Sequence, residues 1–206
     1  VKSMNGGTPR RLTKSTDAEG FELFPSWSRD GKSIVFVSWT DAGLGAIRVI
    51  PAAGGNARTV TTQPGHYYRP KFSPDGKWIA FELAASGGAP EMVAKDMAGP
   101  QWGAASDRIF MLGSEAGKKL LVSTNLAGDE KRVHARGELV NDFIVSPDGH
   151  YMAFRQNYEA FVTPLMPGTQ DLTIAPDAKA LPVIRVSKDG ADYIHWTNDG
   201  ALHWSL

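Results

Sequence analysis

Cysteine is absent from the 206 residues, which excludes disulfide bonds, thiolate nucleophiles and cysteine-based zinc sites. Neither sign of charge is in excess, because 22 Lys and Arg residues balance 22 Asp and Glu residues. A protein that binds nucleic acid needs a basic surplus to neutralise phosphates. We therefore expect no nucleic-acid partner.

Long hydrophobic runs are also missing. No stretch approaches the roughly 20 apolar residues that a membrane-spanning helix needs, and residues 1–7 lack the apolar core of a signal peptide. We expect a soluble chain without membrane insertion. A content of 22 Gly, 13 Pro and 6 Trp favours many short strands over a few long helices.

What the chain does contain is a repeat with a period of about 45 residues. Each copy places an Asp-Gly pair between two apolar runs. In one further copy the glycine has been lost, and the spacing to the copy before it is shortened. The copies cover residues 25–36, 70–81, 143–154 and 195–204, with the degenerate one at 101–111.

The repeat has the chemistry of a β-hairpin. Glycine reaches positive φ freely and the Asp side chain hydrogen-bonds the following backbone, which together make a tight turn. The flanking runs are β-branched and aromatic, as strands require. A second repeated element, in which Gly6–Thr13 matches Gly54–Thr61, supplies an outer strand. Each unit is therefore predicted to be a blade of four antiparallel strands, and the fold class to be an all-β β-propeller.

A single blade leaves both of its faces apolar, so neighbouring blades must pack on it. We expect the core between blades to be formed by Trp27, Phe72, Trp78, Phe81 and Trp102.

Residues 1–206 are expected to form one domain. The first 13 residues end one blade, four units follow, and residues 201–206 stop after the second strand of another blade. The second unit is expected to lack its outer strand. Two arrangements stay open: a ring of about five blades completed from both chain ends, or a truncated arc of a larger propeller. The end inside a strand-like run at 204–206 favours truncation, and thus a fragment of a longer protein.

At these residues the sequence resembles the TolB-type β-propeller repeat, a WD40-like repeat with a Ser-Pro-Asp-Gly-Lys turn and a Gly-Gly-x-x-Arg-x-Leu-Thr outer strand. The resemblance implies a periplasmic or secreted protein that binds proteins of the cell envelope. The matching stretches are Ser28–Phe36, Ser73–Phe81, Ser146–Phe154 and Gly6–Thr13.

Residues 180–206 look more specifically like the propeller that precedes a metal-dependent amidohydrolase domain in large bacterial secreted proteins. This resemblance implies a catalytic barrel beyond Leu206.

No catalytic, metal or cofactor site is expected in these 206 residues. The five histidines have no ligand spacing, no Gly-x-Ser-x-Gly elbow occurs, and the Gly-Gly pairs lack the lysine and helix of a phosphate loop.

Recognition is expected instead in the loops that enter each first strand and those that join the second and third strands. These loops mix aromatic and charged residues, as recognition surfaces do, and His66, Tyr68 and Arg69 lie at the centre of the predicted face. The candidate binding residues are Glu22, His66, Tyr67, Tyr68, Arg69, Asn141, Asp142, Tyr158 and Asp192.

The leading functional hypothesis is a non-catalytic module that mediates protein–protein or domain–domain contacts. The alternative is the propeller part of an enzyme, either an amidohydrolase or a prolyl-oligopeptidase-like peptidase. In both cases the catalytic domain lies outside this chain.

Overall fold

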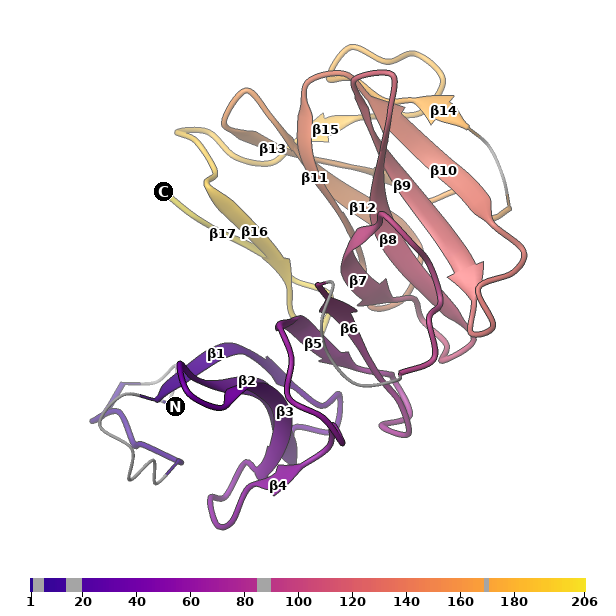
Figure 1. The fold of residues 1–206 in the computed structure, drawn as a ribbon. Helices are drawn as coiled ribbons and strands as arrows, with labels where there is room; N and C mark the ends of the chain where they lie inside the picture. Colours follow the sequence, from indigo (N-terminus) through magenta and orange to yellow (C-terminus); the bar gives the residue numbers. More distant parts are fainter. Residues whose placement is uncertain (2–5, 14–19, 85–89, 169–170) are drawn as a thin grey trace. The chain divides into compact units, whose positions relative to one another are not determined.

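The computed structural model describes residues 1, 6–13, 20–84, 90–168 and 171–206, and all of its named elements are β-strands. This confirms the predicted all-β class. The chain divides into two compact units, Val1–Pro90 and Glu91–Leu206 (Figure 1). Within the described ranges, no helix has the length and hydropathy to cross a membrane.

The first unit opens with a complete blade, blade A, in which four antiparallel strands follow one another in sheet order as predicted. Its strands are β1 (Phe21–Trp27), β2 (Ser33–Thr40), β3 (Leu44–Pro51) and β4 (Arg58–Thr59). Blade B follows, with β5 (Tyr67–Phe72) and β6 (Ile79–Leu83). This second unit of the repeat was expected to lack only its outer strand; its described residues form a two-stranded sheet, and residues 85–89, where a third strand would begin, lie outside the described residues. Residues 6–13, expected to form an outer strand, form only an isolated bridge at Gly6.

The second unit contains two large sheets and a hairpin. Blade C is β7 (Ala98–Trp102), β8 (Arg108–Glu115), β9 (Lys118–Asn125) and β10 (Arg132–Gly137), and its fifth strand is β14 (Leu172–Thr173). Blade D is β11 (Val140–Val145), β12 (Tyr151–Gln156), β13 (Glu159–Pro164) and β15 (Ile184–Arg185). The hairpin is β16 (Tyr193–Trp196) with β17 (Leu202–Ser205).

One connection departs from the simple meander. After β13 the chain returns to blade C, where β14 pairs with β10 in parallel, and then comes back to blade D as β15 (Figure 1). The returning segment also contributes Leu172 and Ile174 to a core cluster that includes Phe110 of blade C and Phe154 of blade D. Blades C and D therefore share one hydrophobic core and one crossing segment.

A hydroxyl, which is buried in the three turns that begin with serine, organises each Asp-Gly turn. In blade A the Ser28 Oγ donates to Asp30 Oδ1 at 2.6 Å and accepts from the Ser33 backbone N–H at 2.9 Å. The Asp30 carboxylate also accepts from the Lys32 backbone N–H at 3.0 Å, and Gly31 has a φ of 69°. The same pattern recurs at Ser73–Asp75 and Ser146–Asp148, and Thr197 donates to Asp199 in the last copy. The turn is thus a four-residue unit that begins with the serine or threonine.

The predicted aromatic core is correct for some residues and wrong for others. Phe72 and Phe81 pack against the cluster of Val35, Val37, Ile47, Val49 and Tyr67. Trp27 and Trp78, in contrast, are 49% and 54% exposed. Both indoles flank an Asp-Gly turn at the end of a hairpin, where a large ring has few neighbours to cover it. Trp102 is half-buried.

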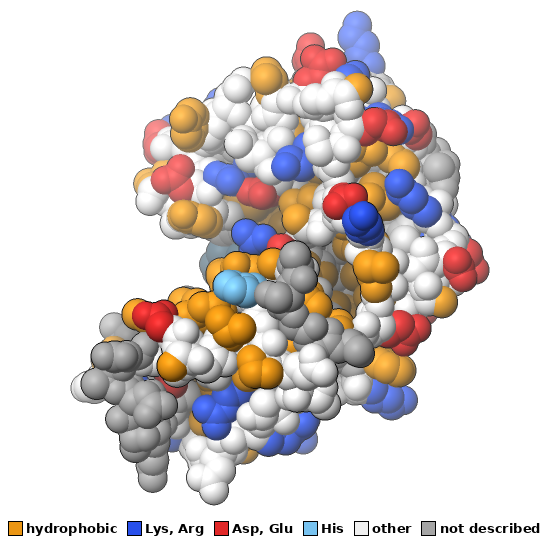
Figure 2. Space-filling model, in the orientation of Figure 1, with side chains coloured by type: hydrophobic (Ala, Val, Ile, Leu, Met, Phe, Trp, Pro, Cys, Tyr) orange, Lys and Arg blue, Asp and Glu red, His pale blue; other side chains and the backbone are white. Residues whose placement is uncertain are grey.

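Charges of both signs are intermixed with hydrophobic side chains on the face shown in Figure 2. This distribution agrees with the zero formal net charge.

Candidate functional site

The first strands of blades A, B and C share a β-bulge. In β1, Leu23 pairs with Val37 and Ser26 pairs with Val35, so two residues of β1 lie opposite a single residue of β2. The bulges in β5 and β7 likewise place two residues opposite one residue of the neighbouring strand. A residue at positive φ followed by proline forms each bulge: Phe24-Pro25 (φ 54°), Arg69-Pro70 (φ 48°) and Gly99-Pro100 (φ 58°). Proline lacks an N–H and is tolerated at such a break in the ladder.

Two of the three bulges are strained. A side chain at positive φ is disfavoured, and a following proline restricts the backbone further. Holding a non-glycine residue there costs on the order of 1–3 kcal/mol. Blade C avoids this cost with Gly99, whereas blades A and B keep Phe24 and Arg69. Bulges of this kind re-aim side chains and are frequent next to functional sites.

The side chains at these two bulges gather on one surface of the first unit. The Phe24 ring lies 5.9 Å from the Tyr68 ring at an interplanar angle of 60°, and both residues are 38% exposed. Arg69 Nη1 contacts both carboxylate oxygens of Glu82, at 2.9 and 3.2 Å. We call Phe24, Tyr68, Arg69 and Glu82 the bulge surface.

The other predicted residues of the first unit have different settings. The His66 ring lies 4.8 Å from the Trp39 ring, whose indole N–H donates to Asp41 Oδ1 at 3.2 Å. Tyr67 is buried, and its hydroxyl donates to the Gln63 carbonyl at 2.7 Å, so its side chain belongs to the core rather than to the surface. Glu22 is exposed and lines an open pocket with Arg48 and Asn56.

In the second unit, an ion pair holds the predicted residue Asp142. Asp142 Oδ2 accepts from Arg155 Nε at 3.0 Å and Nη2 at 2.6 Å. Asp142 lies three residues before the end of β11, as Arg69 lies three before the end of β5. The same cross-strand position therefore carries Arg–Glu in blade B and Asp–Arg in blade D, with the charges exchanged. Asn141 is exposed, at the register shift of β11.

Backbone hydrogen bonds of Ala191 connect Tyr158 and Asp192 to this ion pair. Tyr158 is 77% exposed at the tip of the β12–β13 hairpin, where Asn157 and Tyr158 both have positive φ. Its carbonyl accepts from the Ala191 N–H at 2.6 Å, and Arg155 Nη1 reaches the Ala191 carbonyl at 3.4 Å. The exposed Asp192 follows directly. The structure thus brings Asp142, Tyr158 and Asp192 together in the second unit. In the first unit, His66, Tyr68 and Arg69 are close because they lie within four consecutive residues of the sequence.

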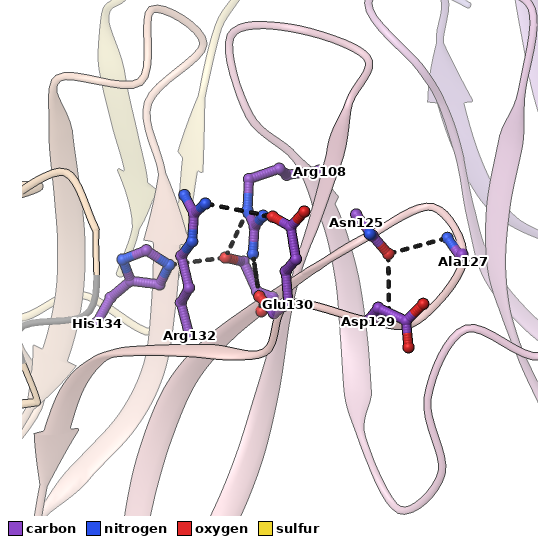
Figure 3. A network of polar contacts seen from close by, with 8 residues as sticks. Arg108, Asn125, Ala127, Asp129, Glu130, Arg132 and His134 are labelled. Carbon is purple, nitrogen blue, oxygen red and sulfur yellow. Dashed lines mark hydrogen bonds and ion pairs between the residues drawn. The ribbon is translucent and has the colours of Figure 1, made fainter.

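Sequence reasoning missed a polar network around Ser123 and His134 (Figure 3). The Ser123 Oγ lies 2.8 Å from His134 Nε2 and accepts from Arg108 Nε at 3.1 Å. Arg108 also donates to the Glu130 carbonyl at 2.6 Å. The pKa of His134 is lowered to about 4, mainly by burial and to a smaller extent by the nearby guanidinium groups of Arg108 and Arg132. No local motif marks this pair, because its members come from different strands.

The Ser123–His134 contact resembles a nucleophile beside a base, but its burial argues for a structural role. Ser123 is fully buried and His134 is 5% exposed, so a substrate carbonyl has no access to the hydroxyl. Across the described part of the chain, no group of three or more His, Asp or Glu side chains is placed to hold a metal ion.

Comparison with known proteins connects these features to a family of repeats. No protein-family model matches the chain. Over 60 residues the chain is 40% identical to the Tol-Pal system protein TolB of Francisella tularensis, a match that covers 29% of this chain and 14% of that protein. The crystal structure of TolB from Acinetobacter baumannii superposes with a TM-score of 0.64 at 20% identity, over 81% of this chain and 46% of that one. The chain resembles TolB in sequence over this stretch and has a TolB-like β-propeller fold.

This TolB-like chain spans less than half the length of either TolB protein. It also matches an uncharacterized peptidase, YuxL of Bacillus subtilis, at 30% identity over 35% of this chain and 11% of the peptidase. An oligogalacturonate lyase in complex with manganese superposes with a TM-score of 0.56 at 10% identity, over 89% of this chain and 61% of the lyase. Such likeness establishes the propeller fold and nothing about activity.

Proposed function

We propose that this chain is a non-catalytic TolB-like propeller module that binds a protein partner through the bulge surface. The observation that carries the proposal is the backbone strain at Phe24 and Arg69, which both have positive φ. At the equivalent position of blade C the residue is Gly99, which adopts positive φ without strain. Strained positions that hold exposed side chains are a mark of functional sites. We also propose that both units belong to one propeller domain, since both carry the same repeat.

The chemistry of the surface suits a protein partner. Aromatic residues and arginine dominate the contacts that contribute most to protein–protein affinity. Phe24, Tyr68 and Arg69 supply both, and the Glu82 carboxylate fixes the guanidinium in place. The relatives' name places them in the Tol-Pal system, and the resemblance to TolB supports a location in the periplasm or outside the cell.

The test separates binding from stability. Phe24→Gly removes the ring and also relieves the positive-φ strain, whereas Phe24→Ala removes the ring alone. We expect the glycine variant to be more stable than the alanine variant by about 1 kcal/mol in chemical denaturation, while both lose the partner equally.

Partner binding is measured by photo-crosslinking in the source cells, with p-benzoylphenylalanine in place of Tyr68. The expected result is one protein adduct that disappears in Phe24→Gly and in Arg69→Gly. The same probe at Tyr151, an exposed position on another blade, is the control. An adduct that survives both glycine substitutions would contradict the proposal.

A second candidate partner is a catalytic domain in the same polypeptide. The match to the peptidase YuxL, of which this chain covers only a small part, favours it, as does the likeness to a puromycin hydrolase over 34% of that chain (TM-score 0.52, 13% identity). The gene sequence after Leu206 decides: a His-x-His motif after a strand supports an amidohydrolase, and a Gly-x-Ser-x-Gly elbow supports a peptidase. The 206-residue chain alone is expected to hydrolyse neither type of substrate.

A further inference from the structure

The sequence contains five Asp-Gly pairs, and four of them form the hairpin turns that open with serine or threonine. The aspartates of these turns are Asp30, Asp75, Asp148 and Asp199, and the fifth pair is Asp189-Gly190. Aspartate isomerises most readily before glycine, because no side chain shields the glycine N–H from the neighbouring carboxyl group. The reaction requires a nitrogen that is free of its hydrogen bond and a carboxyl group that can turn toward it. The setting of each pair therefore decides whether it reacts.

The four turns restrain both reacting groups. In every copy the glycine N–H donates to the carbonyl of the serine or threonine that opens the turn, at 2.9 to 3.0 Å. The carboxylate accepts from the hydroxyl of that same residue and from the backbone N–H two positions further on. In blade D these bonds, from Ser146 and from the His150 N–H, lower the pKa of Asp148 to about 2. An ionised carboxylate is a poor electrophile, because it has no hydroxyl group to release as water.

The pair Asp189-Gly190 has none of these restraints. It lies in the loop between β15 and β16, and Asp189 is exposed. Within the described residues, neither the Asp189 carboxylate nor the Gly190 N–H makes a hydrogen bond, and the carboxylate makes no ion pair. Both reacting groups are therefore available in the folded chain.

We propose that Asp189 isomerises spontaneously to isoaspartate in the folded chain, faster than any of the four turn aspartates. The Gly190 nitrogen bonds to Asp189 Cγ, and the carboxyl hydroxyl leaves with the amide proton as water, which closes a five-membered succinimide. Water then opens the ring. Opening at the former main-chain carbonyl of Asp189 gives isoaspartate, in which the main chain runs through Cγ and is one carbon longer. Opening at Cγ restores aspartate.

The longer main chain does not fit the loop, which is held to the β12–β13 hairpin on both sides of the pair. On one side the Ser187 Oγ accepts from the Ala160 N–H at 2.9 Å. On the other side the Ala191 N–H donates to the Tyr158 carbonyl at 2.6 Å. Only three residues span these two attachments, so an added main-chain carbon must displace one of them.

The attachment at Ala191 should be the one that breaks. The Ser187 side chain is buried, and its hydroxyl also donates to the Glu159 carboxylate, which strengthens the other attachment. Release of Ala191 frees the Tyr158 carbonyl and moves the adjoining Asp192. Isomerisation at Asp189 is therefore a slow chemical change that rearranges two of the candidate binding residues of the second unit.

The test compares two aspartates in one peptide. The 206-residue chain is kept at neutral pH and digested with the protease Glu-C, which releases residues 160–206 with both Asp189 and Asp199. Electron-transfer dissociation in a mass spectrometer distinguishes isoaspartate from aspartate at each position. We expect isoaspartate to form at least about tenfold faster at Asp189 than at Asp199. The same incubation in urea is the control, because without the fold the two sites should react at similar rates.

Two variants test the cause. Asp189→Glu keeps the charge but cannot close a five-membered ring, so no isoaspartate should form at this position. Thr197→Val removes the hydroxyl that holds the Asp199 carboxylate and should accelerate isomerisation there. Hydrogen exchange measures the structural consequence: the Ala191 amide should lose protection as the parent chain ages but keep it in Asp189→Glu.

Two results would overturn the proposal: equal rates at Asp189 and Asp199 in the folded chain, or isoaspartate at Asp189 that forms only in urea. Unchanged protection of the Ala191 amide in the isomerised chain would refute the predicted rearrangement.

Discussion

The serine that opens each Asp-Gly turn does more than precede it. Ser28, Ser73 and Ser146 are all buried, and each hydroxyl joins the Asp carboxylate to the start of the next strand. In blade D this hydroxyl, together with the His150 backbone N–H, lowers the pKa of Asp148 to about 2. The carboxylate is therefore ionised in the folded turn at pH values where a free aspartate is already protonated.

Replacement of Ser146 should show how much the hydroxyl contributes. Ser146→Ala leaves the Tyr151 N–H without its acceptor, which should lower the free energy of unfolding by about 1–2 kcal/mol. The same variant should lose part of its resistance to acid, because the depressed pKa stabilises the fold above about pH 4 and this gain fades as the pH falls toward 2. Urea unfolding at pH 7 and pH 3 measures both effects. Ser114→Ala, at an exposed position, is the control, and equal stabilities for the two variants would contradict the assigned role.

At the scale of elements, β10 carries a histidine where the other repeats have an apolar residue. When Arg132 is aligned with Arg10 and Arg58, His134 takes the place of Leu12 and Val60. Its ring lies 5.1 Å from Phe110 and its Nε2 bonds Ser123, so the buried position is retained but a titratable group fills it.

This histidine should make blade C sensitive to acid. The pKa of His134 is about 4 in the folded chain against about 6.5 when unfolded, so the unfolded chain binds the proton more readily. Stability is then full above pH 6.5 and falls as the pH drops toward 4. His134→Leu should remove most of this slope in urea unfolding followed between pH 7 and pH 4, whereas His150→Gln, on an exposed turn, should retain it. A variant slope equal to that of the parent chain would refute the assignment.

For the whole molecule, the distribution of cores suggests that the second unit is self-sufficient. The cluster that unites blades C and D lies entirely within Glu91–Leu206. We expect residues 91–206, produced alone, to melt in one cooperative thermal transition and to show near-ultraviolet circular dichroism. Residues 91–168 are the matched control, because they omit Leu172 and Ile174 and should lose cooperativity. A longer fragment that binds a hydrophobic dye and melts without a transition would disprove this view.

Local features were predictable from the sequence, and long-range ones were not. The Asp-Gly turns and the strand order of blade A follow from glycine conformation and apolar runs, which act within a few residues. The parallel pairing of β14 had no such signal, because two paired residues are too short for a pattern. The exposure of Trp27 and Trp78 was missed because burial depends on neighbours that composition does not reveal.

The candidate site shows the same division. The run from His66 to Arg69 could be found as an aromatic and charged loop next to a strand. The contact between Phe24 and Tyr68 could not, since it joins two blades. Pro25, Pro70 and Pro100 were an available signal that was not used: a proline inside a strand-like run indicates a bulge. The predicted role of the nine binding residues stays a prediction.

The return of the chain to blade C also sets an order of events during synthesis. Ala135 of β10 finds its partner, Leu172, only after the first three strands of blade D have been made. At about 5–20 residues per second, the ribosome takes a few seconds to cover that interval. During this time the edge of β10 is open to wrong pairing. Blade C is therefore completed only after most of blade D has been synthesised. Until then a chaperone or another strand can bind the edge of β10 in place of β14.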